Sequence, residues 1–433
     1  MRSIGAACLV VSVTITMTMA ASTLPKAAAP SPVSGVRATA TSSSVTLSWS
    51  NPAAGTFTGV MVRRAEGHKA PTAPTSGTLI ARVPAPRRST VDPSVSADTT
   101  YSYALFAYKG TAYSRSTAIT VTTSRKPLTG INVFSGASYG FNEPFSVAYD
   151  GTNVWVTNTD ASSVTELNAA TGTLVRTISG GSFGINRPLG IAFDGTHLWV
   201  ANAIGNSVTE IYAATGKWVR TLSGGSYGFN HPYAIAVGDG DVWVTDYYSE
   251  AVTEFSASTG RWVRTLSGGS YGFDGPEDIA VHGVDVWVTN YLGESVSELS
   301  ASDGRAVRTL SGGPYGFNGP SAVGFTGTDA WVANYDNDTV TELVDSTGAW
   351  VQTLSAGSYA FSGPTAFAVR GADVWVLNDG NSVTEFDASS GSWIKTLSGA
   401  RYHFDAPTGI ALAGTRLWVT NELGASVTEF PAS

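Results

Sequence analysis

Hydrophobic and polar residues alternate in short runs along most of the chain. Clear examples are residues 44–52, 59–64 and 99–108. A period of two places successive side chains on opposite faces of a strand. The segments between the runs are rich in Gly, Asp and Asn, which favour tight turns over helices. The pattern therefore predicts an all-β protein.

The first group of runs, residues 32–123, contains about seven expected strands and one Trp, Trp49, in an alternating run. Short strands at this spacing without a cysteine pair predict a two-sheet sandwich. The segment resembles a fibronectin type III domain in two residues. Trp49 matches the core Trp of that family, and Tyr101, in ADTTYSY, matches its tyrosine corner. The sequence contains no Arg-Gly-Asp, so the resemblance implies no integrin-binding loop. We expect this domain to act as a spacer.

Beyond residue 129 the alternating pattern itself repeats. A Trp-Val or Trp-centred strand returns five times after 44 residues and once after 43, at Trp155, Trp199, Trp243, Trp287, Trp331, Trp375 and Trp418. This period is typical of four-stranded propeller blades. One copy, residues 188–224, reads as the strands LGIAF, HLWVAN, NSVTEI and KWVRTLSG joined by turns. We therefore predict a seven-bladed β-propeller over residues 129–430.

The two ends of the repeat region complement each other. The last copy ends at SVTEFPAS and lacks a fourth strand, whereas residues 130–144 align with the end of a copy. Residues near Gly130 to Ser135 are therefore expected to be the outer strand of the last blade. This pairing would remove an exposed strand edge.

The segment GGSYGFN, residues 224–230, has the glycines and hydroxyl of a phosphate-binding loop. Related segments recur before every blade, however, and no Gly-Lys-Ser/Thr is present. No helix is expected after them to offer its amide groups to a phosphate. We interpret these segments as linkers between blades.

The repeat, P-x-x-I-A-x-D-G-x-x-V-W-V-T-N-x-x-x-x-S-V-T-E, resembles the YVTN-type repeats of secreted bacterial propellers and the seven-bladed virginiamycin B lyase family. That family carries a His after the blade-opening Pro and an acid that closes the second strand, which together hold Mg²⁺ and supply acid–base chemistry. Here the residues after that Pro are Phe145, Leu189, Tyr233, Glu277, Ser321, Thr365 and Thr408. Only Asp246 is acidic at the strand-closing position. The resemblance thus implies the fold and argues against streptogramin lyase activity.

The chain begins with Arg2, an apolar run and then small residues, which predicts a signal peptide over residues 1–21 and a secreted, extracellular protein. A transmembrane helix is the rival interpretation, but the run is too short. The single cysteine, Cys8, lies inside this segment, and residues 22–31 form a spacer. The chain carries 25 Lys and Arg against 33 Asp and Glu. This acidic balance argues against nucleic acid as a partner and against an anionic membrane surface.

Seven glutamates recur at one position of the repeat: Glu166, Glu210, Glu254, Glu298, Glu342, Glu385 and Glu429. A base follows most of them after ten residues, as Arg264 follows Glu254. A hairpin at that spacing places the two side chains opposite each other, so we predict structural ion pairs rather than catalytic groups. The blades whose equivalents are Gln352 and Asn132 are expected to lack the pair. With no cysteine after the leader and no pair of histidines at metal spacing, we expect no metal and no other cofactor.

The most informative residues are those that break the repeat on the face where the linkers meet the turns between second and third strands. We call this the top face. The predicted ligand-binding residues there are His231, Tyr233, Asp246, Tyr247, Tyr248, Glu277, Asp278, Tyr291 and Tyr335. Tyrosines with mixed charge are typical of recognition surfaces. No catalytic residue is assigned.

The sequence thus predicts a monomeric secreted protein that binds an extracellular protein or polysaccharide without catalysis and does not insert into a membrane. Two alternatives remain open. One is a propeller enzyme, either a virginiamycin B lyase-like lyase or a glycosidase of extracellular polysaccharide. The other is a purely structural protein of the cell surface.

Overall fold

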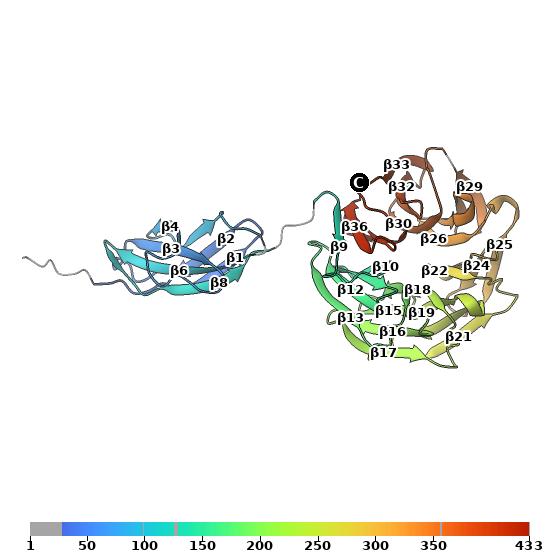
Figure 1. Ribbon diagram of the computed structural model, residues 1–433, viewed down its shortest axis with the longest axis horizontal. Coiled ribbons are helices and arrows are strands. Elements are labelled where there is room, and N and C mark those ends of the chain that lie inside the picture. Colours follow the sequence, from blue (N-terminus) through green and yellow to red (C-terminus); the bar gives the residue numbers. More distant parts are fainter. Residues whose placement is uncertain (1–27, 98, 125–128, 356, 433) are drawn as a thin grey trace, which may run out of the picture. The chain divides into compact units, whose positions relative to one another are not determined.

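The structure, a computed structural model, describes residues 28–97, 99–124, 129–355 and 357–432. The predicted signal peptide and Cys8 lie outside these residues, as does most of the predicted spacer. The chain divides into two compact units, Met1–Lys126 and Pro127–Ser433 (Figure 1). In the described ranges the only helical elements are three short 3-10 turns, η1 (Tyr247–Ser249), η2 (Gly313–Tyr315) and η3 (Tyr335–Asn337), and no helix is long and apolar enough to cross a membrane. The all-β prediction is confirmed.

The first unit is built from two antiparallel sheets. One contains β1 (Ser34–Ala40), β2 (Val45–Ser50) and β5 (Ser89–Asp92); the other contains β4 (Thr78–Pro84), β3 (Gly59–Glu66), β6 (Thr100–Lys109), β7 (Ala112–Tyr113) and β8 (Thr117–Thr122). Leu47 and Trp49 from one sheet share a buried cluster with Val62 and Leu105 from the other. The alternation of the sequence therefore builds a sandwich around one apolar layer.

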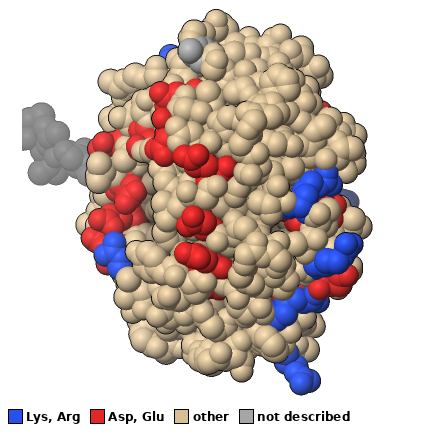
Figure 2. Space-filling model, turned by 90° about the vertical axis from the view of Figure 1, so that its right-hand side faces the viewer, with Lys and Arg blue, Asp and Glu red and all other residues tan. Residues whose placement is uncertain are grey.

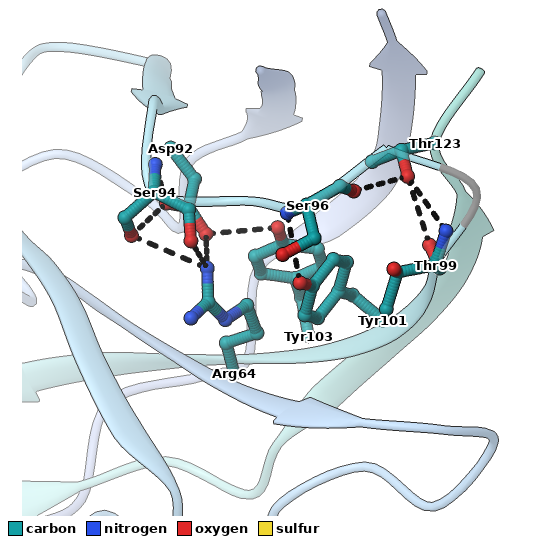
Figure 3. Close-up of polar contacts among 8 residues, drawn as sticks. All are labelled: Arg64, Asp92, Ser94, Ser96, Thr99, Tyr101, Tyr103 and Thr123. Carbon is teal, nitrogen blue, oxygen red and sulfur yellow. Dashed lines mark hydrogen bonds and ion pairs between the residues drawn. The ribbon is translucent and has the colours of Figure 1, made fainter. Parts of the chain in front are cut away.

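Polar contacts tie down one end of this sandwich (Figure 3). The Tyr101 hydroxyl accepts a hydrogen bond of 3.0 Å from the Ser96 amide, the contact of a tyrosine corner. The fully buried Asp92 accepts hydrogen bonds from the Tyr103 hydroxyl and the Arg64 guanidinium, at 2.9 and 2.8 Å. The corner agrees with what a fibronectin type III resemblance implies, and that family assignment itself stays a prediction.

The second unit contains seven four-stranded antiparallel sheets (Figure 1), in which strands adjacent in sequence pair, except that β9 joins the last sheet. The first strands of neighbouring blades contact one another, and the first strand of the last blade contacts that of the first, so the blades form a closed ring. The blades are β10 (Pro144–Tyr149), β11 (Asn153–Asn158), β12 (Ser163–Asn168) and β13 (Leu174–Ser179); β14 (Pro188–Phe193), β15 (His197–Asn202), β16 (Ser207–Tyr212) and β17 (Lys217–Ser223); β18 (Pro232–Gly238), β19 (Asp241–Asp246), β20 (Ala251–Ser256) and β21 (Trp262–Ser267); β22 (Pro276–His282), β23 (Asp285–Asn290), β24 (Ser295–Ser300) and β25 (Ala306–Ser311); β26 (Pro320–Thr326), β27 (Asp329–Asn334), β28 (Thr339–Val344) and β29 (Ala349–Ser355); β30 (Pro364–Arg370), β31 (Asp373–Asn378), β32 (Ser382–Asp387) and β33 (Ser392–Ser398); and β34 (Pro407–Ala413), β35 (Arg416–Asn421), β36 (Ser426–Pro431) and β9 (Asn132–Ser135).

The predicted closure is confirmed. Strand β9 pairs antiparallel with β36, so that Phe134 lies opposite Val427 and Asn132 opposite Glu429. The Phe134 ring also stacks on Trp418 of the same blade, with a centroid distance of 5.2 Å. The N-terminal strand therefore supplies both the fourth ladder and part of the core of the last blade.

Packing between blades explains why the Trp and linker motifs recur. All seven repeat tryptophans are fully buried, and Trp155 shares a cluster with Ile191 and Leu198 of the next blade. In the linker GGSYGFN, Gly224 has a φ of 95°, a conformation that favours glycine. Tyr227 stacks on Phe229 in the same linker and donates a hydrogen bond to the Gly260 carbonyl. The linker motif is thus a packing element.

The predicted ion pairs between the third and fourth strands form. Their carboxylates are buried, whereas those of typical surface ion pairs are exposed. Glu254 lies opposite Arg264, and its carboxylate is 2.8 Å from Arg264 Nε. In the blade with Gln352, that amide donates to Glu342 instead. In the last blade, Asn132 lies opposite Glu429 and donates a hydrogen bond to it, so the pair between third and fourth strands is absent as predicted. Glu429 instead pairs with Arg416 on β35, the other neighbouring strand, which the ten-residue spacing did not predict.

Candidate ligand-binding cavity

Two repeat positions surround the centre of the top face. The first is the residue after the Pro that opens each blade, and the second is the residue that follows the second strand of each blade. Figure 1 shows the first strands β10, β18, β22, β26 and β30 around the middle of the ring. These strands lie nearest the axis of the ring, and residues at their starts line a central cavity of about 780 Å³. The repeat therefore delivers variable side chains to one place on an otherwise uniform scaffold.

Eight of the nine predicted ligand-binding residues line this cavity. They come from two neighbouring blades and one further hairpin: His231, Tyr233, Tyr247, Tyr248, Glu277, Asp278, Tyr291 and Tyr335. The structure thus brings together residues that are far apart in the sequence, from His231 to Tyr335.

Asp246 is the predicted residue that the structure places elsewhere. It is fully buried at the end of β19, where its carboxyl accepts hydrogen bonds from the Asn230 amide and contacts Thr253 Oγ1 at 2.9 Å. The equivalent Asn202 likewise accepts a hydrogen bond from a linker amide, that of Asn186, but its side-chain nitrogen donates to Ser207 and Thr209. Burial raises the pKa of Asp246 to about 8, so it is mainly neutral at pH 7 and can replace the Asn of the other blades. Asp246 is therefore part of the blade and not of the cavity wall.

Aromatic rings form two groups on the wall. His231 stacks on Tyr248, with 4.5 Å between centroids, and Tyr233 lies 5.9 Å from Tyr247. Phe145 meets Tyr233 edge-on at 5.8 Å. The other group is Tyr291 and Tyr335, with centroids 6.3 Å apart. The 3-10 turns η1 and η3 carry Tyr247, Tyr248 and Tyr335.

The titratable lining of the cavity is acidic. Its carboxylates are Glu277, Asp278, Asp379 and Glu422, and no Lys or Arg belongs to the lining. Burial lowers the pKa of His231, so this residue adds no positive charge near pH 7. A ligand that fits the cavity electrostatically must therefore supply positive charge or many hydrogen-bond donors.

The four carboxylates differ in their partners. Asp379 accepts a hydrogen bond of 2.7 Å from the Tyr335 hydroxyl, and Asp278 accepts one of 3.0 Å from the Val323 amide. The carboxyl of Glu277 has no hydrogen-bond or ion-pair partner among the residues that the structure describes. Glu422 likewise has no such partner, so Glu277 and Glu422 are the two carboxyls available to a ligand.

The electrostatic field of the cavity keeps protons on its acids. Burial, reinforced by Asp278 and Asp336, raises the pKa of Glu277 to about 8. Burial also raises the pKa of Asp278 to about 6, because backbone hydrogen bonds only partly offset it. The pKa of Glu422 is raised by burial and by the nearby Glu143 and Asp379. Among the described residues, Glu422 is the only one of these three carboxyls with a nearby cation, Arg187, which opposes the rise of its pKa.

Sequence reasoning missed some of the lining. Phe145 occupies the same repeat position as Tyr233, and Asp379 occupies the same position as Tyr335. Phe367, on the first strand β30, lies deeper in the cavity wall. The ligand-binding residues were predicted from residue type, which favoured tyrosines and charged residues on two blades. A prediction from repeat position would have included Phe145 and Asp379.

Comparisons with known proteins show the fold of the second unit. No family model and no curated protein matches the sequence. Two solved structures are similar: a chain of Kuenenia stuttgartiensis hydrazine synthase (TM-score 0.55, 16% identity, 67% of this chain and 96% of that chain) and virginiamycin B lyase from Staphylococcus aureus (TM-score 0.56, 16% identity, 69% of this chain and 98% of that chain). The predicted likeness to a virginiamycin B lyase propeller is therefore confirmed at the level of the fold.

The residues of the cavity do not fit the Mg²⁺ site that the lyase resemblance implies. The ring of positions after the opening Pro contains no His, and the one strand-closing acid, Asp246, is buried outside the cavity. Within the described part of the chain, no group of three or more His, Cys, Asp or Glu side chains is arranged to hold a metal ion. We therefore derive no chemistry through that metal.

Proposed function

We propose that this is a secreted protein that binds an extracellular polysaccharide or protein in the top-face cavity without catalysis. One observation carries the proposal: the residues that break the repeat meet in a single cavity of about 780 Å³. This volume falls within the range of about 300–1,000 Å³ that is usual for ligand pockets. The ring geometry brings these positions together, and their departure from the repeat gives the cavity an aromatic and acidic lining. In this proposal the N-terminal sandwich serves as a spacer.

Two carboxyls give a second candidate function some support. Glu277, with a pKa of about 8, and Asp278, with a pKa of about 6, line the same cavity. A protonated and an ionised carboxyl are the groups that a glycosidase needs as acid and base. A hydrolase of extracellular polysaccharide is therefore the enzyme that the cavity would serve best, ahead of a lyase.

The proposal is tested by probing the mature protein with arrays of glycans and extracellular proteins. Each ligand found is then measured against Tyr247→Ala in the cavity and Trp262→Ala on an outer strand. Trp262 is 45% exposed and lies outside the cavity lining, so it is a matched aromatic control. We expect Tyr247→Ala to weaken binding at least tenfold and Trp262→Ala to leave it unchanged. Loss of binding through Trp262→Ala alone would move the site to the outer strands.

The enzyme alternative has a separate readout. Each ligand found on the arrays is incubated with the protein, and its mass is followed over time. Turnover that Glu277→Gln abolishes while binding persists would establish a hydrolase and contradict the non-catalytic proposal. An unchanged ligand mass with intact binding supports the proposal.

A further inference from the structure

We propose that the cavity recognises free amino groups, and that its ligand is a saccharide built of amino sugars. This inference rests on the proposed function, because it names the ligand class of the same cavity. It requires that the cavity attract cations, that it hold an ammonium group closely, and that its shape suit a sugar rather than a lysine side chain. The structure supports each of these points.

The surroundings of the cavity are strongly acidic. The linkers and the turns between second and third strands contribute these carboxylates: Glu143, Asp160, Glu250, Asp274, Glu294, Asp336, Asp338, Asp379, Asp405 and Glu422. The same segments contain only two basic residues other than histidine, Arg187 and Arg401. Arg187 is already paired with Glu143 and Asp160, at 3.2 and 2.5 Å. Figure 2, which views the propeller from its side and not onto the cavity, shows that charge is also unevenly spread there, with Asp and Glu gathered in the left and middle and Lys and Arg mainly on the right. A field of one sign over a concave site raises the local concentration of oppositely charged ligands.

Inside the cavity, aromatic side chains and an unpaired carboxyl line one wall. Glu277 lines the cavity together with Tyr233, Tyr247, Tyr291 and Tyr335, and its charge contributes to raising the pKa of each of these tyrosines. Ammonium groups bind favourably to the faces of aromatic rings and to carboxylates. An ammonium group beside Glu277 would therefore gain both contacts and would favour the ionised form of this carboxyl, whose pKa is raised mainly by burial.

The size and lining of the cavity favour a sugar over a lysine side chain. A cavity of about 780 Å³ has room for a whole small ligand, whereas one lysine side chain would fill only part of it. Tyr233, Tyr247 and Phe145 offer flat surfaces to a sugar ring. Ser321, Thr365 and Thr408 also line the cavity, and their hydroxyls already donate to backbone carbonyls, so each can offer a ligand only an acceptor oxygen.

The test compares two ligands that differ only at nitrogen: a trisaccharide of glucosamine with free amines and the same trisaccharide fully N-acetylated. Their affinities for the mature protein are measured by calorimetry at pH 7. We expect the free amine form to bind at least tenfold more tightly, and more weakly as salt rises. Glu277→Gln should lower its affinity about tenfold. Glu294→Gln, the same change on an exposed top-face residue outside the cavity lining, should leave the affinity unchanged.

The other outcomes separate this inference from the proposed function. Equal affinity for the two trisaccharides, or binding that neither Glu277→Gln nor Glu422→Gln alters, overturns the role of the amino group. If Tyr247→Ala still abolishes such binding, the cavity remains the binding site and the proposed function stands. Binding of a lysine-rich peptide with no binding of either trisaccharide overturns the saccharide. Equal melting temperatures of the three Gln variants and the wild type ensure that affinity, not folding, is compared.

Discussion

At the scale of single residues, two buried carboxyls that look alike in the sequence have different roles. Asp246 and Glu277 both break the repeat, and burial raises the pKa of each to about 8. Asp246 has hydrogen-bond partners inside its blade and takes the place of an Asn. Glu277 has none and faces the cavity. The difference between structure and site thus lies in the partners of the carboxyl, which its sequence position does not specify.

The role of Asp246 can be tested through the pH dependence of stability. Its pKa rises from 3.8 to about 8 on folding, so folding takes up a proton and the free energy of unfolding falls as pH rises through this window. Asp246→Asn should remove that loss. At pH values above 5 the variant should therefore melt at a higher temperature than the wild type, and at pH 8 its free energy of unfolding should be larger by about 1–3 kcal/mol. The double change Asp246→Asn, Ala251→Ser restores the pair found as Asn202 and Ser207 and serves as control. Lower stability of both variants at pH 8 would show that the charged form of Asp246 is needed.

Ligand binding should depend on pH through the cavity acids. Groups that face Glu277 are Asp278, Asp336, Tyr233, Tyr247, Tyr291 and Tyr335. The tyrosines stay neutral because their pKa values are raised, whereas Asp278 and Glu277 ionise near pH 6 and pH 8. Affinity for a permanently charged quaternary ammonium form of the trisaccharide should therefore increase from pH 5 to pH 9. In Glu277→Gln the part of this increase near pH 8 should disappear.

At the scale of strands and hairpins, the ion-pair ladder connects neighbouring strands through buried glutamates. Glu254 is 1% exposed, and burial raises its pKa to about 7 although Arg264 lowers it. Loss of the arginine should raise this pKa further, because desolvation is then unopposed. A carboxyl with a raised pKa costs stability as pH increases above its unfolded value of 4.5.

Arg264→Ala should therefore destabilise the propeller more at pH 8 than at pH 6, by about 1–3 kcal/mol at the higher value. Arg264→Gln is the matched control, since Gln352 donates a hydrogen bond to Glu342 at the equivalent place. It should recover part of the loss, and neither change should affect ligand binding. The measurement is thermal unfolding at the two pH values. A loss that is equal at both would mean that packing of the arginine side chain, and not its charge, carries the effect.

At the scale of the whole molecule, the sequence predicted whatever depends on the repeat. The spacing of Trp155 and its equivalents sets the blade length, and the missing fourth strand after Phe430 indicates the closure by β9. Contacts that depend on three-dimensional neighbours were harder to predict. Arg416 pairs with Glu429 from a strand that the ten-residue spacing does not include. The direction of the Asp246 side chain at the end of β19 is set by hydrogen bonds that the alternation does not encode.

Closure of the ring gives the last prediction. A chain that starts at Pro144 keeps all seven strands with a repeat Trp but lacks β9, so β36 loses its partner and Trp418 loses the ring of Phe134. Each ladder hydrogen bond contributes about 0.5–1.5 kcal/mol, and the bare edge would invite pairing between molecules. We expect this chain to melt at a clearly lower temperature and to aggregate. A chain that starts at Ser124 lacks the sandwich but keeps β9, and it should melt like the propeller of the full mature protein. Since both truncations remove the sandwich, a difference between them isolates the segment that contains β9, and equal melting and aggregation would mean that β9 does not hold the ring closed.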